Sequence, residues 1–425
     1  MDCVDTTFAS YVQTLQEMHY EIKNSSMSDS RIGKRKSSIT EKGSGLNMEN
    51  ICSIKEENRI KIRKYISKGN SGHVDFYPRY IQIEHSNLCN AQCIMCNHFF
   101  LGNKGGSHLD IDVVKKLEPI LPYCETIMIN GDGEPFLNPN VTEFIKLYSS
   151  FGVKVGTNTN LCYIPEDMWE VIGNAFEFIN ISCDGVSKET YELIRRNLSF
   201  DKFISNLNRL NKIAPRLRKN LDCVVMKQNV LELPQIVKFA IENGFSAVKF
   251  NKLGVNPCIG NKFDSEEYYM KTYTEKILEA IEIAERGDIR IQFIPYETAN
   301  YGDIKTIQPL DELKNEIDER QMTAKKKFSD LSLSNDYCAV QAQEDDFDIV
   351  DGSLCTWGIE RCYIDLKGNV TTCCYNTRKY MGNLYEESFE EIWNGKNYVR
   401  FREMMRAGFL PSWCQECNWI KNQKY

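Results

Sequence analysis

Cys89, Cys93 and Cys96 form the chemically most distinctive pattern in the chain, a C-x3-C-x2-C spacing. Thiolates bind zinc and iron–sulfur clusters, and a closed zinc site or a fully ligated [4Fe–4S] cluster takes four ligands. Three thiolates from one loop would leave one iron of such a cluster open to a further ligand through nitrogen and oxygen. The spacing therefore predicts a metal centre with an open position, which is the arrangement that catalysis needs.

Six more cysteines lie in the last 75 residues and indicate a second metal site. A β-hairpin around Lys367–Gly368 would bring Cys355 and Cys373 together, and a closing C-x2-C would add Cys414 and Cys417. By spacing alone, these four thiols suit a zinc ribbon as well as a [4Fe–4S] cluster. The remaining two cysteines, kept as substitute or additional ligands, are Cys362 and Cys374.

The overall composition narrows the class of protein. The chain has 425 residues, 42% hydrophobic and 26% charged, with a net charge of −7 and 17 cysteines. No apolar run reaches the ~18 residues of a membrane-spanning helix, and residues 1–10 lack the apolar core of a secretory signal. We therefore expect a cytoplasmic protein without a membrane partner, in which clustered cysteines serve metals rather than disulfides. Without a basic patch on a folded segment, no nucleic-acid partner is expected.

Short apolar runs alternate with amphipathic stretches from Tyr80 onward and predict a parallel α/β architecture. The predicted strands are Tyr80–His85, Thr126–Asn130, Val153–Thr157, Phe176–Cys183, Leu221–Met226 and Ala247–Asn251. The predicted helices are Asp110–Ile120, Pro139–Phe151, Glu166–Ile172, Ser187–Ile194, Phe203–Ile213 and Leu231–Asn243, followed by a longer helix at Ser265–Arg286 and a strand at Ile289–Phe293. Six such units predict a partial (β/α)6 barrel, with its chemistry at the carboxyl ends of the strands.

Polar and glycine-rich segments stand where these predicted strands end. The segment Gly131-Asp132-Gly133-Glu134-Pro135 follows the second strand. Further candidates at or just after the later strands are Asn158, Ser182, Arg195 and Asn229. Parallel strands place their carboxyl ends at one edge of a sheet, so these groups should lie near the cysteine loop.

The cysteine loop and the Gly131–Pro135 segment together resemble the signature motifs of the radical S-adenosylmethionine (SAM) enzymes. The resemblance implies that Cys89, Cys93 and Cys96 hold a [4Fe–4S] cluster whose open iron binds the amino and carboxylate groups of SAM. It implies that Gly131 to Pro135, and Glu134 above all, bind the methionyl ammonium, with the glycines allowing close approach. It assigns the SAM carboxylate to Ser182 and Arg195, the SAM sugar or the substrate to Asn158, and a further polar contact to Asn229. Met95 replaces an often aromatic residue and would pack on the adenine.

The C-terminal cysteines resemble the SPASM/Twitch domains appended to many enzymes of that superfamily. The matching elements are Gly368-x4-Cys373 and Glu391-Ile392-Trp393-Asn394. The resemblance favours one auxiliary [4Fe–4S] cluster on Cys355, Cys373, Cys414 and Cys417 over zinc. The expected organisation is a flexible or partly helical extension (1–75), the barrel (76–300), a connector (301–350) and the auxiliary-cluster α+β domain (351–425).

These resemblances imply an oxidoreductase that cleaves SAM to a 5′-deoxyadenosyl radical, abstracts hydrogen from a substrate carbon and passes an electron to the auxiliary cluster. The implied partners are a flavodoxin- or ferredoxin-type reductant and a small-molecule or peptide substrate. A sugar or aminocyclitol is the first choice, because residues 1–75 lack a clear winged-helix pattern for a leader peptide. Maturation of a ribosomal peptide is the alternative. A non-catalytic electron carrier and a zinc-binding protein are the alternatives from other classes.

Overall fold

The computed structural model divides the chain into two compact units, residues 1–43 and 44–425, and all described residues belong to the second. The structure describes residues 47–68, 71–96, 98, 105–253, 270–293, 347–349, 355–374, 379–407, 409–411 and 414. These ranges leave out the first 46 residues of the predicted extension, most of the predicted connector, and Cys417.

A ten-stranded sheet forms the centre of the described fold, in the order β13-β12-β11-β1-β3-β4-β5-β7-β8-β9. The strands from the barrel sequence are β1 (Tyr80–Ile83), β3 (Thr126–Ile129), β4 (Lys154–Thr159), β5 (Phe176–Ser182), β7 (Arg218–Val225), β8 (Ala247–Lys252) and β9 (Arg290–Phe293). Neighbours among these seven strands pair in parallel. The predicted mostly parallel α/β fold and its strand positions are confirmed.

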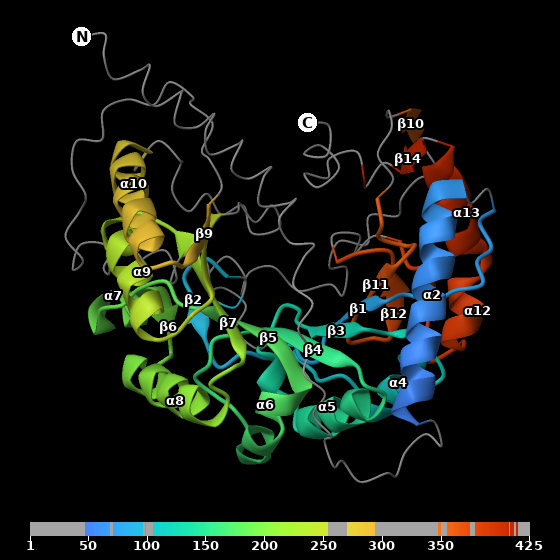
Figure 1. Ribbon diagram of the computed structural model, residues 1–425, viewed down its shortest axis with the longest axis horizontal. Coiled ribbons are helices and arrows are strands. Elements are labelled where there is room, and N and C mark those ends of the chain that lie inside the picture. The colour runs from blue at the N-terminus through green and yellow to red at the C-terminus, as the bar shows by residue number, and fades with distance from the viewer. Residues whose placement is uncertain are drawn as a thin grey trace. The chain divides into compact units, whose positions relative to one another are not determined.

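Helices connect these strands and cover one side of the sheet (Figure 1). They are α4 (Ile111–Lys115), α5 (Val141–Ser150), α6 (Ile172–Ala175), α7 (Lys188–Ile194), α8 (Phe200–Ile213), α9 (Leu233–Glu242) and α10 (Met270–Arg286), with 3-10 turns η1 (Leu121–Tyr123), η2 (Pro135–Leu137), η3 (Glu166–Glu170) and η4 (Val230–Glu232). Serine side chains begin two helices, because Ser187 accepts from the backbone N–H of Thr190 and Ser199 from that of Lys202. The helix predicted at Asp110–Ile120 ends at Lys115, since Pro119 cannot donate to the helical ladder.

Alternate residues of each strand point to opposite sides of the sheet. Ile179 and Ile181 of β5, and Leu221 and Cys223 of β7, are fully buried in the main hydrophobic core. Cys124 and Cys183 are also fully buried and Cys162 is 8% exposed, so these isolated cysteines, like Cys223, are core residues. The intervening residues of β5 and β7 are mostly polar and partly exposed.

The C-terminal segment extends the same sheet. Strands β11 (Arg361–Ile364), β12 (Asn369–Thr371) and β13 (Gly382–Asn383) form an antiparallel unit, and β11 pairs in parallel with β1, Tyr80 opposite Arg361 and Ile83 opposite Ile364. Helices α12 (Phe389–Trp393) and α13 (Lys396–Arg406) follow, and strands β10 (Phe347–Ile349) and β14 (Phe409–Pro411) pair separately. One continuous sheet therefore joins the barrel strands to the cysteine-rich segment, which the sequence did not indicate.

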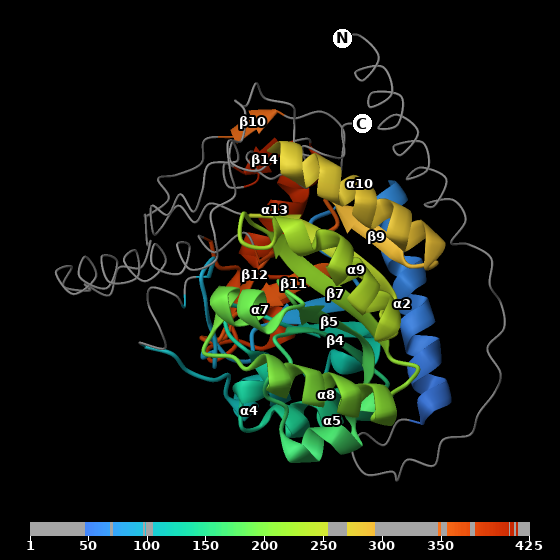
Figure 2. The same cartoon turned by 90° about the vertical axis from the view of Figure 1, so that its left-hand side faces the viewer.

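Helix α2 (Met48–Lys68) belongs to this folded unit and lies beside α13 in Figure 1, and Figure 2 shows the same helix from another side. Lys55 Nζ donates to the backbone oxygen of Gly152 at 2.8 Å, and Arg406 Nη1 donates to that of Tyr65 at 3.1 Å. The predicted partly helical extension thus contains an ordered helix that contacts the barrel and the C-terminal segment. Among the described residues, no helix has the length and apolar character required to cross a bilayer.

Candidate active site

The three-cysteine loop leaves the carboxyl end of β1 and is held by a second short ladder. Strand β2 (Gln92–Cys93) pairs antiparallel with β6 (Arg195–Arg196), and Cys93 lies opposite Arg195. The backbone N–H of Ile94 donates to Ile194 at 2.9 Å, and that of Cys96 donates to Cys93 at 2.9 Å. The loop is therefore fixed by the end of α7 as well as by β1.

Burial controls the chemistry of these thiols. It raises the pKa of Cys89 and of Cys93 to about 12 each, although the N–H of Ala91 favours the Cys89 thiolate and Arg195 favours the Cys93 thiolate. At neutral pH both thiols would hold their protons until a cationic centre displaces them. The donor set is thus suited to a metal centre and unsuited to a free nucleophile.

The arrangement of ligands also bears on the kind of centre. In the described part of the chain, no three His, Cys, Asp or Glu side chains are placed around one common metal ion. Each thiolate of a [4Fe–4S] cluster binds its own iron, so cluster ligands need not converge on one point. Three cysteines in one partly buried loop are compatible with such a cluster, and their role as its ligands stays a prediction.

The Gly131–Pro135 segment packs directly on the cysteine loop. A Cβ at Gly133 would lie 2.4 Å from the backbone oxygen of Leu88 and 2.5 Å from that of Ser86, so only glycine fits. The backbone N–H of Glu134 donates to the same Leu88 oxygen at 2.8 Å. His98, just beyond the third cysteine, contacts the backbone oxygen of Asp132 through Nε2 at 3.1 Å.

Glu134 is 2% exposed, and its carboxylate holds the end of β4. It accepts from Thr159 Oγ1 at 2.7 Å and from the backbone N–H of Asn160 at 2.8 Å. Asn160 in turn donates to Asn90 Oδ1, inside the cysteine loop, at 2.7 Å. Burial raises the pKa of Glu134 to about 7, with the bonds from Asn160 and Thr159 opposing that shift. Binding of the methionyl ammonium by Glu134 stays a prediction.

Arg195 and Asp184 form a buried ion pair behind the cysteine loop. Arg195 Nη2 lies 2.7 Å from Asp184 Oδ2, and Nη1 donates to Cys93 Sγ at 3.8 Å. Asp184 Oδ1 also accepts from the backbone N–H of Val224 at 2.7 Å. The described contacts of Arg195 thus support the cysteine loop, whereas the sequence assigned Arg195 to the SAM carboxylate. Asp184 was missed, although a buried arginine generally requires an acidic partner.

Asn229 is fully buried and its amide is used inside the protein. Its Nδ2 donates to the backbone oxygens of Asp184 and Val224 at 2.9 Å each, and its Oδ1 accepts from the N–H of Met226 at 2.8 Å. These bonds fix the turn after β7. Met95, by contrast, is partly exposed next to the core.

Asn158 belongs to a ladder of amides across three strands. Asn220 Nδ2 donates to Asn180 Oδ1 at 2.9 Å, and Asn180 Nδ2 donates to Asn158 Oδ1 at 2.8 Å. All three lie in register on the partly exposed side of the sheet. One step further along the strands, Ser182 pairs with Asp222, and Asp222 pairs with Lys249 of β8. The sequence analysis did not single out Asn180, Asn220, Asp222 and Lys249. The alternation of polar with apolar residues along these strands was the signal that could have identified them.

The C-terminal cysteines fall into two groups. Cys362 is fully buried in β11, where burial holds the pKa of its thiol well above the usual value, and it belongs to the core. Cys355, Cys373, Cys374 and Cys414 are partly exposed and remain the candidate ligands in the described part of the chain. Because β12 runs antiparallel to β11 with Thr371 opposite Tyr363, Cys373 follows near the amino end of the parallel strands. The loop with Cys89, by contrast, follows the carboxyl end of β1. The three-cysteine loop and Cys373 therefore lie at opposite ends of the adjoining strands β1 and β11.

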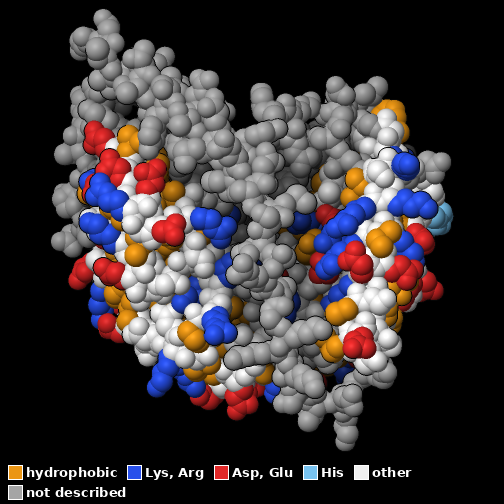
Figure 3. All heavy atoms as spheres, in the orientation of Figure 1, with side chains coloured by type: hydrophobic (Ala, Val, Ile, Leu, Met, Phe, Trp, Pro, Cys, Tyr) orange, Lys and Arg blue, Asp and Glu red, His pale blue; other side chains and the backbone are white. Residues whose placement is uncertain are grey.

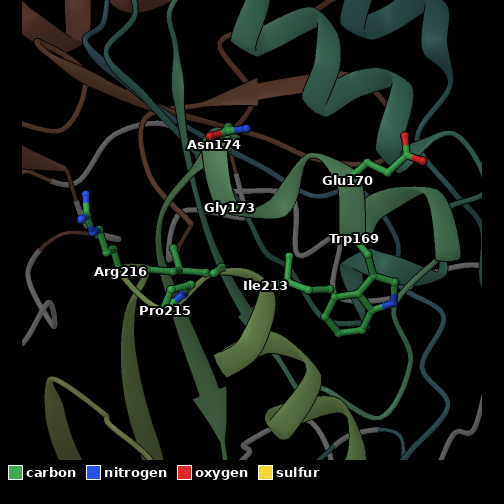
Figure 4. Close-up of a pocket in the computed structure, with 9 residues that line it drawn as sticks. Trp169, Glu170, Gly173, Asn174, Ile213, Pro215 and Arg216 are labelled. Atoms are coloured by element: carbon green, nitrogen blue, oxygen red, sulfur yellow. The ribbon is translucent and has the colours of Figure 1, made fainter. Parts of the chain in front are cut away.

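A surface pocket lies apart from this site. Trp169, Ile213, Pro215 and Arg216 line it, between η3 and the end of α8 (Figure 4). These segments precede β5 and β7, so the pocket is at the amino ends of the strands, away from Cys89 and Gly131. On the face drawn in Figure 3, Lys and Arg side chains are interspersed with Asp and Glu.

Two protein-family models match the chain in the order predicted. The radical SAM superfamily model matches residues 83–240, and SPASM, an iron–sulfur cluster-binding domain, matches residues 355–418. Together the two matches cover just over half of the chain.

Individual proteins are more distant. The chain is 24% identical over 347 residues to the AdoMet-dependent heme synthase of Methanosarcina barkeri, covering 81% of this chain and 89% of that protein. The structure of Streptococcus suis SuiB bound to precursor peptide SuiA has a TM-score of 0.52 at 15% identity, covering 93% of this chain and 79% of SuiB. Native anSMEcpe with bound AdoMet has a TM-score of 0.51 at 18% identity, covering 81% and 87% of the two chains. At such identities, the two structures show a shared fold.

Proposed function

Because the chain belongs to the radical SAM superfamily and ends in a SPASM domain, we propose that it oxidises a polar organic substrate by removing hydrogen from one of its carbon atoms. The family consists of enzymes. Membership therefore argues against a non-catalytic electron carrier and against a zinc-binding protein. The cofactors of this chain are SAM, a [4Fe–4S] cluster in the radical SAM domain and auxiliary iron–sulfur clusters in the SPASM domain.

The cysteine loop is the place for the first cluster. Cys89, Cys93 and Cys96 would hold it; SAM bound there would supply the radical that removes hydrogen from the substrate, and the auxiliary cluster would take up the electron left on the substrate. Arg195, beside Cys93, places a positive charge next to a ligand that must be a thiolate. The hydrogen bonds that join Leu88, Glu134 and Asn160 keep the SAM-binding element against the loop. A flavodoxin- or ferredoxin-type reductant would supply the first electron.

The observation that supports a polar substrate is the ladder Asn158, Asn180 and Asn220. Carboxamides on the partly exposed side of a sheet offer both donors and acceptors to hydroxyl or amide groups. Asp222 and Lys249 add opposite charges in register on neighbouring strands. Burial raises the pKa of Asp222, and the charge of Lys249 opposes that shift, so Lys249 favours the carboxylate. We call these five side chains, the three asparagines with Asp222 and Lys249, the substrate wall. A sugar or aminocyclitol, which carries hydroxyl and amino groups on adjacent carbons, could form hydrogen bonds with this wall.

Modification of a ribosomally made peptide is the second candidate. The fold is shared with SuiB, whose structure contains the precursor peptide SuiA. Backbone amides of an extended peptide could use the same asparagine ladder. The two candidate functions differ in the size of the substrate. Small polyols should therefore compete with the substrate in the first case, and peptides should compete with it in the second.

The experiment compares both substrate classes on reconstituted protein without oxygen. Wild-type protein with SAM and dithionite should release 5′-deoxyadenosine, and the matching substrate class should increase that release and become oxidised. Asn180→Ala should raise the KM for substrate by about tenfold, the cost of one to two lost hydrogen bonds, while SAM cleavage without substrate continues. Asn174→Ala, outside the wall, is the matched control. An unchanged KM in Asn180→Ala would exclude the ladder as the substrate wall.

A further inference from the structure

Glu84 is a buried carboxylate that neither the cysteine loop nor the amide ladder uses. It directly follows β1, is 7% exposed, and its backbone N–H donates to Ile364 at 2.9 Å. The pairing of β1 with β11 therefore continues to Glu84. At this point the barrel strand and the C-terminal hairpin are in contact.

The Glu84 carboxylate joins the two segments that end these strands. Its Oε1 accepts from the backbone N–H of Asp132 at 2.8 Å. The backbone N–H of Leu366, in the turn after β11, also favours the charged form of this carboxylate. One residue thus receives a side-chain hydrogen bond from the predicted SAM-binding element and pairs through its backbone with the strand that begins the C-terminal hairpin.

The fit against the first of these segments is close. A Cβ at Gly131 would lie 2.3 Å from Glu84 Cγ and 2.4 Å from Oε1, so glycine is required there. The sequence assigned Gly131 to close approach of SAM, whereas the described structure shows a second reason for this glycine. Any shift of Glu84 would be felt directly by residues 131 and 132.

The groups facing Glu84 are acidic. They are Asp132 from the loop after β3, and Asp365 and Tyr363 from β11 and its turn. Burial raises the pKa of Glu84 to about 7, Asp132 and Asp365 raise it further, and the N–H bonds from Asp132 and Leu366 oppose the shift. Both N–H groups favour the carboxylate form, and the population of this form changes near neutral pH.

We propose that Glu84 is a positioning residue that couples the C-terminal cysteine-rich hairpin to the SAM-binding element, because its backbone pairs with Ile364 of β11 and its side chain holds Asp132. This rests on the proposed function insofar as Gly131 to Pro135 bind SAM. A change in the hairpin, such as loss of a cluster ligand, would then alter SAM affinity through Glu84. SAM affinity should also weaken as pH falls through about 7.

Glu84→Gln is the most informative variant. A carboxamide has one oxygen to accept a bond and a donor NH2 group that opposes the other backbone N–H. We expect about tenfold weaker SAM binding by equilibrium dialysis, loss of its pH dependence near 7, and unchanged iron content. Glu143→Gln, at an exposed position on α5, is the matched control and should bind SAM as wild type does. Wild-type SAM affinity with the wild-type pH profile in Glu84→Gln would overturn the proposal.

A double-mutant cycle tests the coupling itself. Cys373→Ala should change SAM affinity in wild-type protein and have a clearly smaller effect in Glu84→Gln. Equal effects in both backgrounds would overturn the coupling. Hydrogen exchange on protein without clusters gives a readout that does not need turnover: Glu84→Gln should speed exchange at Asp132 or Leu366, and unchanged exchange at both would also overturn it. Wild-type protein that binds SAM without cleaving it would contradict the proposed function and leave these binding and exchange outcomes to decide the role of Glu84.

Discussion

Arg195 Nη1 lies 3.8 Å from Cys93 Sγ, across the two-residue ladder in which these residues are paired. Its other terminal nitrogen lies 2.7 Å from Asp184 Oδ2, and Asp184 is fully buried. The order carboxylate, guanidinium, thiol places one positive charge between two groups that are negative when the cluster is bound. The charge balance of the cysteine loop is therefore set by β6 and by the turn after β5, outside the loop itself.

Each cysteine of the loop should be required for SAM cleavage. We expect Cys89→Ala, Cys93→Ala or Cys96→Ala to abolish 5′-deoxyadenosine release, and the triple variant to lose about four irons, the content of one cluster. Iron bound by the C-terminal cysteines should remain. Cys52→Ala, at an exposed position on α2, is the matched control. Normal 5′-deoxyadenosine release by the triple variant would refute the assignment.

Removal of Arg195 should destabilise the protein more than removal of the whole ion pair. Arg195→Ala leaves the buried Asp184 carboxylate without its counter-charge, which typically costs about 3–5 kcal/mol of unfolding free energy. The double change Asp184→Asn with Arg195→Met should recover part of that loss. Chemical denaturation and iron content measure both effects. If the single and double variants are equally unstable, the ion pair does not explain the burial of Arg195.

Glu134→Ala should weaken SAM binding without emptying the cluster. A hydrogen bond to a charged group is worth roughly 1.5–3 kcal/mol, or about ten- to a hundredfold in affinity. The variant also loses the bonds from Thr159 and Asn160, so iron content must be measured beside affinity. Wild-type affinity in a variant with full iron would place the methionyl group elsewhere.

The stability of the protein should fall with rising pH because of its buried carboxyls. The pKa of Glu134 and of Glu84 is raised from 4.5 to about 7, so the folded state holds protons that the unfolded state has released. Their contribution is complete below pH 4.5 and is lost as pH rises through about 7. Denaturation of the protein without clusters across this range should show the decline, and Glu134→Gln should flatten it. A slope that Glu134→Gln leaves unchanged would assign the decline to other groups.

The C-terminal cysteines should separate by function. Cys373→Ser should lose the auxiliary cluster, whereas Cys362→Ser should keep it and lower the unfolding free energy, because it puts a hydroxyl into the core. Replacing Cys414 and Cys417 by Ala should leave SAM cleavage but block net substrate oxidation. Protease resistance measured beside product formation shows whether the segment stays folded. A folded variant without the second cluster that still forms the normal amount of product would rule out the electron-acceptor role.

The amino-acid sequence by itself determined the local pattern of the fold. Alternation of apolar residues located β5 and β7, and turn residues ended each strand within a few positions. The spacing of Cys89, Cys93 and Cys96 indicated an open metal centre without any knowledge of neighbours. These features depend on residues close together in the chain, so they can be read from one segment at a time.

Tertiary structure alone decided the contacts between distant segments. The pairing of β1 with β11, the ion pair of Arg195 with Asp184, and the bond of Glu84 to Asp132 each join segments whose own sequences fit several partners. The same holds for Cys362. Its spacing is compatible with a metal ligand, but strand β11 places its side chain in the hydrophobic core. Strand register sets which side chains meet, and register follows from the packing of the whole sheet against its helices.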